Sequence, residues 1–286
     1  MTQEMERNLD YLQNSLVRAG FGDIYHEQLK KDMAAGKPVI EFPWSGPEQS
    51  PGAKDYILLR PNIVESEDRP GFYIFTGIAA TKFINEKPEI SVTIPHYKMT
   101  GMTAAQAVTV LSGGTVLHTE GEDSNKRAKQ YFSAIDFKKP VKEGEQHALV
   151  RVAAKSFDLP RLLSNERYMG REEEKAEILL NVQNGLKADV TLQKTDEHGR
   201  YPKVSLQLGL VENKTQDTYE LALKVLDRSG NELRQHVQQP KAAVEMKTTL
   251  KLQTQKKPEG LPGSTLSLAG AGEPGGRTRR QNTPKV

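Results

Sequence analysis

The chain opens with apolar residues at helical spacing, and glycines then interrupt the pattern. The apolar residues of this first face are Met5, Leu9, Leu12 and Leu16. Their spacing predicts a helix that ends near Arg18. After the break at Gly20-Phe21-Gly22, Asp23 is the predicted N-cap of a second helix, which ends before Gly36.

Alternation of apolar and polar residues follows and indicates strands. Ile90, Val92 and Ile94 alternate with Ser91 and Thr93, as in a half-buried strand. Apolar runs predict further strands at residues 39–42, 56–59, 72–75 and 129–137.

Two adjacent glycines, Gly113 and Gly114, raise the question of a phosphate-binding loop. Such loops place their glycines before a helix, where free backbone N–H groups face the anion. Here a helical segment comes first, with Thr103 as its predicted N-cap and Gln106 at the spacing of a capping box. The glycines are therefore predicted to end this helix.

The second half of the chain repeats this mixture of helices and strands. Residues 147–156 are strand-like, Asp158 begins a short helix, and residues 171–184 form a helix that Gly185 ends. A strand begins near Val190. Two alternating runs then predict a hairpin: Val204, Leu206, Leu208 and Leu210, followed by Tyr219, Leu221, Leu223 and Val225.

The segments 29–42 and 178–192 both run helix, glycine, lysine and strand, which suggests a weak internal repeat. The predicted fold class is α+β, with two small modules of helices packed on antiparallel sheets. The predicted modules are residues 1–142 and 147–238.

Residues 240–286 are predicted to form a flexible, basic tail. One last alternating run at residues 244–252 allows a strand, but the following segment is rich in Gly, Pro and Ser and predicts disorder. From residue 241 onward the chain has nine Lys/Arg and three Asp/Glu, whereas the remainder has 31 and 34. The tail is therefore basic and the body weakly acidic.

Composition limits the chemistry that the chain can carry. The absence of cysteine from the 286 residues excludes disulfides and thiolate ligands. His26-Glu27 begins like a zinc-protease helix, but Lys30 stands where the second histidine would be needed. No catalytic residue, metal ligand or cofactor is predicted. The N-terminus has no hydrophobic leader and no apolar run is long enough for a membrane span, so a cytoplasmic protein is expected.

The tail supplies the candidate binding residues for nucleic acid. Cations on a flexible segment can contact phosphates without reading bases. These cations are Lys256, Lys257, Arg277, Arg279, Arg280 and Lys285. No aromatic residue lies between them, so base stacking is not indicated, and solvated charge without a partner is the alternative.

A set of turns, caps and core positions between residues 8 and 235 carries a family resemblance. The landmarks are Gly20-Phe21-Gly22-Asp23, Met33, Gly36-Lys37-Pro38, Met102-Thr103, Ala107, Leu111, Gly114, Asp136-Phe137 and Phe157-Asp158-Leu159. With them the chain resembles a family of uncharacterised proteins carried by conjugative transposons of gut bacteria, related to a domain of unknown function. The resemblance implies a mobile element as the setting and supplies no catalytic residues.

Three hypotheses about function follow. The first is a non-enzymatic accessory protein of a conjugative element that binds a protein partner encoded with that element. The second is sequence-independent binding of nucleic acid through the tail. The third is an enzyme whose catalytic carboxylates come from distant segments. This hypothesis is kept because such pairs cannot be recognised in one sequence.

Overall fold

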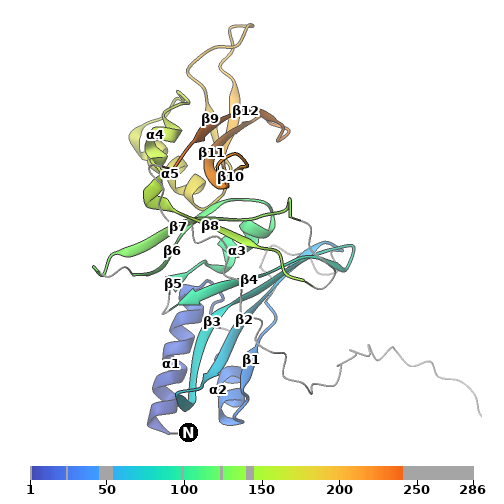
Figure 1. The fold of residues 1–286 in the computed structure, drawn as a ribbon, viewed down its shortest axis with the longest axis vertical. Helices are drawn as coiled ribbons and strands as arrows, with labels where there is room; N and C mark the ends of the chain where they lie inside the picture. Colours follow the sequence, from blue (N-terminus) through green and yellow to red (C-terminus); the bar gives the residue numbers. More distant parts are fainter. Residues whose placement is uncertain are drawn as a thin grey trace, which may run out of the picture. The chain divides into compact units, whose positions relative to one another are not determined.

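The structure of the chain is a computed structural model that describes residues 2–23, 25–44, 54–97, 100–122, 125–139 and 145–240. Figure 1 labels its helices and strands. Helices combine with three antiparallel sheets, which confirms the predicted α+β class. The predicted tail, including the alternating run at 244–252, lies outside the described residues.

The first sheet is antiparallel and has the strand order β1-β2-β3-β4-β5. Its strands are β1 (Val39–Glu41), β2 (Tyr56–Ser66), β3 (Arg69–Ile84), β4 (Lys87–Tyr97) and β5 (Thr100–Gly101). Helix α1 (Gln3–Arg18) packs against β3, and helix α2 (His26–Ala34) packs against β1. Apolar faces of the helices and the sheet share one core, to which Leu12, Leu29 and Ile63 belong.

The side chain of Asn8 fastens α1 to an uncovered part of β3. Strand β4 pairs with β3 only from Gly77 onward, so Tyr73 has a strand neighbour on the β2 side alone. On the other side, Asn8 Oδ1 accepts a hydrogen bond from Tyr73 N at 2.7 Å, and Asn8 Nδ2 donates to Tyr73 O at 2.9 Å. The amide of Asn8 thus replaces the missing strand, and it satisfies buried backbone groups.

Helix α3 (Ala104–Leu111) has the predicted capping box. Gln106 N donates to Thr103 Oγ1 at 3.2 Å, and Thr103 N donates to Gln106 Oε1 at 3.1 Å. Gly113 follows the helix with a φ of 89°, a conformation that favours glycine. The glycine pair ends the helix, as the sequence predicts.

A second, three-stranded sheet follows with the order β6-β7-β8. Its strands are β6 (Val116–Glu122), β7 (Ala128–Ile135) and β8 (Leu149–Ala153). Val116 and Ile135 belong to the core of the first sheet, whereas Phe132 and Val152 belong to a second core. The pairing of β7 with β8 crosses the predicted module boundary between residues 142 and 147.

The third sheet is antiparallel with the order β12-β11-β10-β9. After the short 3-10 helix η1 (Ala154–Ser156) come the helices α4 (Leu159–Leu163) and α5 (Glu172–Gln183). The strands are β9 (Ala188–Thr191), β10 (Lys203–Asn213), β11 (Thr218–Leu226) and β12 (Glu232–Gln238). Helix α4 packs against β11 and β12, and α5 packs against β9 and β10.

The first and third sheets follow the same order of elements. Two helices precede the strands of each sheet, and the second helix packs against the first strand. Gly36 and Gly185 stand at equal distances after α2 and α5, with φ of 66° and 74°. The strands that follow differ in phase, because Ile40 is buried in β1 whereas Ala188 and Val190 are buried in β9.

Asp23 does not cap α2, so this prediction is wrong. The N-cap is Tyr25, whose side chain makes no capping hydrogen bond. Its ring stacks on Phe42 at 4.7 Å, and its hydroxyl donates to Pro43 O at 3.1 Å. These tertiary contacts hold the chain where α2 begins, and local capping chemistry cannot predict them.

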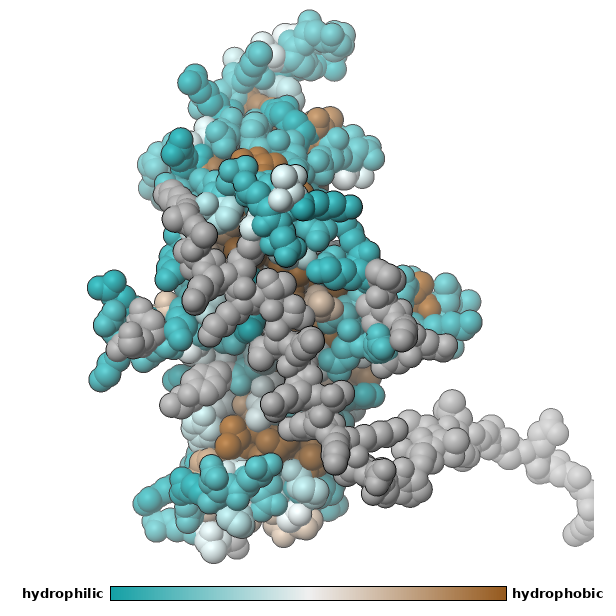
Figure 2. All heavy atoms as spheres, in the orientation of Figure 1, coloured by the Kyte–Doolittle hydropathy of each residue, from teal (hydrophilic) through white to brown (hydrophobic). Residues whose placement is uncertain are grey.

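Hydrophilic residues predominate over the described part of the face in Figure 2, and smaller hydrophobic areas interrupt them. Large apolar residues that are at least half exposed include Leu180, Tyr201 and Leu233, at 57%, 53% and 53%. Single exposed apolar residues of this kind are ordinary on protein surfaces.

Candidate functional site: the groove beside strand β9

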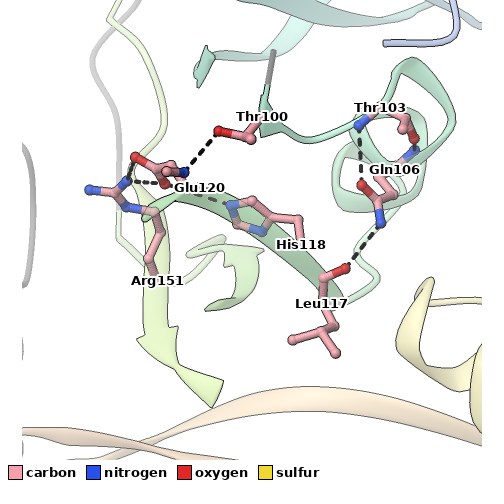
Figure 3. A network of polar contacts seen from close by, with 8 residues as sticks. Thr100, Thr103, Gln106, Leu117, His118, Glu120 and Arg151 are labelled. Carbon is pink, nitrogen blue, oxygen red and sulfur yellow. Dashed lines mark hydrogen bonds and ion pairs between the residues drawn. The ribbon is translucent and has the colours of Figure 1, made fainter. Parts of the chain in front are cut away.

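Several buried or half-buried carboxylates are paired with cations, as Glu120 illustrates in Figure 3. Arg151 Nη1 lies 2.6 Å and 2.5 Å from the two Glu120 oxygens, and His118 Nε2 lies 3.7 Å from Glu120 Oε2. Burial raises the pKa of Glu120, but the hydrogen bonds from His118 and Arg151 outweigh it and lower the pKa. Glu120 is therefore ionised and engaged by its neighbours.

The same view shows how α3 is tied to its surroundings. Gln106 Nε2 donates to Leu117 O of β6 at 3.0 Å and to Asn184 Oδ1, just after α5, at 3.2 Å. This side chain thus serves the helix cap and two neighbouring elements at once. Its arrangement is that of a structural junction.

Glu166 is another enclosed carboxylate, with a side chain only 6% exposed. Arg234 Nε and Nη2 bind its two oxygens at 2.6 Å and 2.7 Å, and His236 Nε2 lies 2.6 Å from Oε1. Burial raises the pKa of Glu166, but the hydrogen bonds from Arg234 and His236 lower it overall. The cluster ties the segment after α4 to β12.

Asp136 joins β7 to the third sheet in a similar way. Tyr219 Oη donates to Asp136 Oδ2 at 2.9 Å, and Lys139 Nζ lies 3.1 Å from the same oxygen. In the described part of the chain, no group of three or more His, Asp or Glu side chains is placed to hold a metal ion. These carboxylates pair with the chain's own cations and thereby join neighbouring elements of the fold.

A groove of about 720 Å³ lies between helix α5 and the edge of the third sheet. Both faces of β9 and the start of β10 contribute to it, and Met169 and Arg228 also line it. Its volume is in the range of ordinary ligand sites. The polar residues of its lining are Glu174, Glu177, Asn181, Asp189, Thr191, Lys203, Ser205 and Arg228.

The floor of this groove is the open edge of β9. Leu192 N donates to Pro202 O at 2.9 Å, on the side of β10. In an antiparallel pair, the N–H and C=O groups of successive residues point alternately toward the partner strand and away from it. Because Leu192 bonds toward β10, the backbone N–H and C=O groups of Asp189 and Thr191 point away from β10. Met169 N confirms this direction, because it donates to Thr191 O at 2.8 Å from the outer side.

Part of that edge is already paired and part is free. Residues 167–169 run beside residues 191–193 through the bridge between Tyr168 and Leu192. Within the described residues, no backbone group bonds the N–H of Asp189, the C=O of Asp189 or the N–H of Thr191. Unpaired strand edges of this kind accept an additional strand.

The two walls of the groove carry opposite charges. Helix α5 contributes the exposed Glu174 and Glu177 together with the buried Ile178. On the other side stand Lys203 and Arg228. Arg228 lies in a loop that Asp227 Oδ1 holds by accepting from Ser229 N and Asn231 N, both at 2.8 Å.

Local sequence explains why α5 and β9 meet as they do. Glu174 Oε2 accepts from Arg171 N at 2.9 Å at the start of the helix. At its end, a Cβ on Gly185 would lie only 2.8 Å from Thr115 O and 2.7 Å from Thr109 Cγ2. Glycine is therefore required both for the turn and for the close contact with α3 and β6.

The six cations predicted to bind nucleic acid, Lys256 to Lys285, lie outside the described residues and stay a prediction. The sequence did not indicate the groove residues Asp189, Thr191, Lys203 and Arg228. The only local signal is that Asp189 and Thr191 flank the buried Val190. Their role depends on β9 being an edge strand, which is a property of the sheet.

No model of a known protein family, no curated protein and no solved structure matches the chain. In the described part of the chain, the helices are too short or too polar to cross a membrane.

Proposed function

We propose that this chain is a non-enzymatic binding protein that holds an extended segment of a protein partner at the edge of β9. The observation that carries the proposal is the row of outward backbone groups at Asp189 and Thr191 on the floor of a groove. A strand added there would continue the sheet order β12-β11-β10-β9.

Strand addition uses the backbone of both partners. Each backbone hydrogen bond contributes about 0.5–1.5 kcal/mol net, so the few free groups at Asp189 and Thr191 support modest affinity. Side chains in the groove then decide which segment binds, because alternate residues of a strand face its two walls.

The biological setting that we propose is a conjugative mobile element, with a cytoplasmic protein and a partner encoded with it. This part rests on the family resemblance alone. Binding of nucleic acid through the tail remains the second hypothesis and an enzyme the third.

The test compares two variants of Thr191 that differ in one backbone donor. Thr191→Pro removes the outward N–H and places a ring in the path of an added strand, while it leaves the bonds to β10 intact. Thr191→Val changes the side chain and keeps the N–H. Peptides selected from a random library displayed on phage supply the ligands, and fluorescence anisotropy measures their affinities.

We expect Thr191→Pro to weaken the selected peptides by at least about tenfold relative to Thr191→Val, because a lost bond and a steric clash together exceed 1.4 kcal/mol. Circular dichroism checks that both variants are folded. Equal affinities in two folded variants would refute strand addition at β9.

A further inference from the structure

We infer that the segment bound in this groove carries basic side chains toward α5 and acidic side chains toward Lys203 and Arg228, with an apolar residue between the basic ones. The inference rests on the proposed function and specifies its ligand. It follows from the charges on the two walls and from the geometry of an added strand.

A strand that extends the sheet at β9 presents its side chains alternately to the two faces. On one face its neighbours are Ala188 and Val190, which are buried beneath α5. On the other face its neighbours are Asp189 and Thr191, which lie opposite Ser205 and Lys203. Consecutive residues of the ligand therefore meet different walls.

The wall formed by α5 is acidic with an apolar centre. Glu174 and Glu177 are exposed, and Ile178, which is 9% exposed, stands next to them. The carboxylate of Glu177 has no hydrogen bond or ion pair to any described residue. A Lys or Arg of the ligand can pair with it, while an apolar residue contacts Ile178.

The opposite wall is basic. Lys203 and Arg228 are exposed, and neither side chain has an ion-pair partner in the described part of the chain. The one acid beside them, Asp189, already accepts a hydrogen bond from Ser205 Oγ at 2.5 Å. Acidic residues of the ligand can therefore form ion pairs with Lys203 and Arg228.

Two peptides of identical composition test the inference. The first is Thr-Lys-Glu-Val-Glu-Lys-Thr, in which Val and both Lys share one face and the Glu residues share the other. The second, Thr-Glu-Lys-Val-Lys-Glu-Thr, exchanges the charges around the same Val. Affinities for the full-length protein are measured by fluorescence anisotropy at low and at high salt.

We expect the first peptide to bind about tenfold more tightly than the second at low salt. Exposed ion pairs contribute about 0.2–1 kcal/mol each, and the peptides differ in several of them. High salt should reduce the difference. In the double variant Glu177→Lys with Arg228→Glu, the preference should be lost, because Glu174 and Lys203 keep one charge of the original sign on each wall.

Equal affinities of the two peptides, tighter binding of the second, or no binding of either would overturn the inference about charge. The proposed function has its own test, since it requires only that library-selected peptides depend on the N–H of Thr191. Selected peptides that bind equally well to Thr191→Pro and Thr191→Val would refute the function itself.

Discussion

At the scale of single residues, the structure uses its buried charges to hold elements together. Glu166 illustrates this, because the side chains of Arg234 and His236 on β12 contact its two carboxylate oxygens at hydrogen-bonding distance. A buried carboxylate without such partners would be strongly destabilising. The stability of the third sheet should therefore depend on the charge of Glu166.

Replacing Glu166 by Gln should lower the free energy of unfolding at pH 7 by about 2 kcal/mol, because Arg234 loses its charged partner. The lowered pKa of Glu166 also makes this contribution dependent on pH. It is fully present above the ordinary carboxyl value of 4.5 and is lost as the pH falls through the lowered pKa of the folded state. The difference between wild type and Glu166→Gln should thus shrink below about pH 4.5.

Urea unfolding at several pH values measures this difference. Glu232→Gln on β12, the strand that carries Arg234 and His236, is the control, since Glu232 pairs with Lys224 at 3.6 Å and its side chain is 43% exposed. Its effect should stay below about 1 kcal/mol. A difference between wild type and Glu166→Gln that does not change between pH 7 and pH 3 would contradict this role.

At the scale of elements, helix α3 shows what the sequence can predict and what it cannot. Thr103 and Gln106 predict the start of the helix because a capping box is local chemistry. The same reasoning failed at Asp23, where contacts of Tyr25 with Phe42 and Pro43 decide where α2 begins. Strand β6 was not predicted, because its only buried residues are Val116 and His118 and polar residues dominate the rest.

Gln106 is expected to stabilise the fold more than a surface helix residue does. Gln106→Ala should lower the free energy of unfolding by about 1–3 kcal/mol, because Thr103 N and Leu117 O lose their partners. Alanine is the better helix former, so helix propensity cannot cause this loss.

Gln106→Glu is the matched variant for that measurement. It keeps the acceptor for Thr103 N and removes the donor to Leu117 O and Asn184 Oδ1, so its loss should come from the junction alone. Thermal and urea unfolding compare the three proteins. A Gln106→Ala variant within about 0.5 kcal/mol of wild type would show that the junction does not contribute.

At the scale of the whole molecule, the alternation of apolar residues predicted the hairpin of β10 and β11 but not the groove. Alternation reports which side of a strand is buried. It does not report which strand lies at the edge of a sheet, and the free backbone of Asp189 and Thr191 depends on that alone. The candidate site is therefore a consequence of long-range pairing.

The basic tail provides a separate prediction at this scale. If its six cations engage duplex DNA, the log–log salt dependence of binding should have a slope near about −5, and deletion of residues 255–286 should abolish binding. Binding of full-length and truncated protein is measured across a salt series. Sequence-selective DNA binding by the truncated protein would show that the nucleic-acid site lies in the folded part.

Hydrogen exchange at Asp189 and Thr191 tests strand addition most directly. Their amides point away from β10 and have no bond within the described residues, so both should exchange quickly in the free protein. NMR follows these two amides without and with a saturating library-selected peptide. We predict that the peptide slows exchange at Asp189 and Thr191, whereas Val190, already bonded to β10, changes little. A peptide that binds and leaves both amides exchanging at their free rates would contradict strand addition at β9.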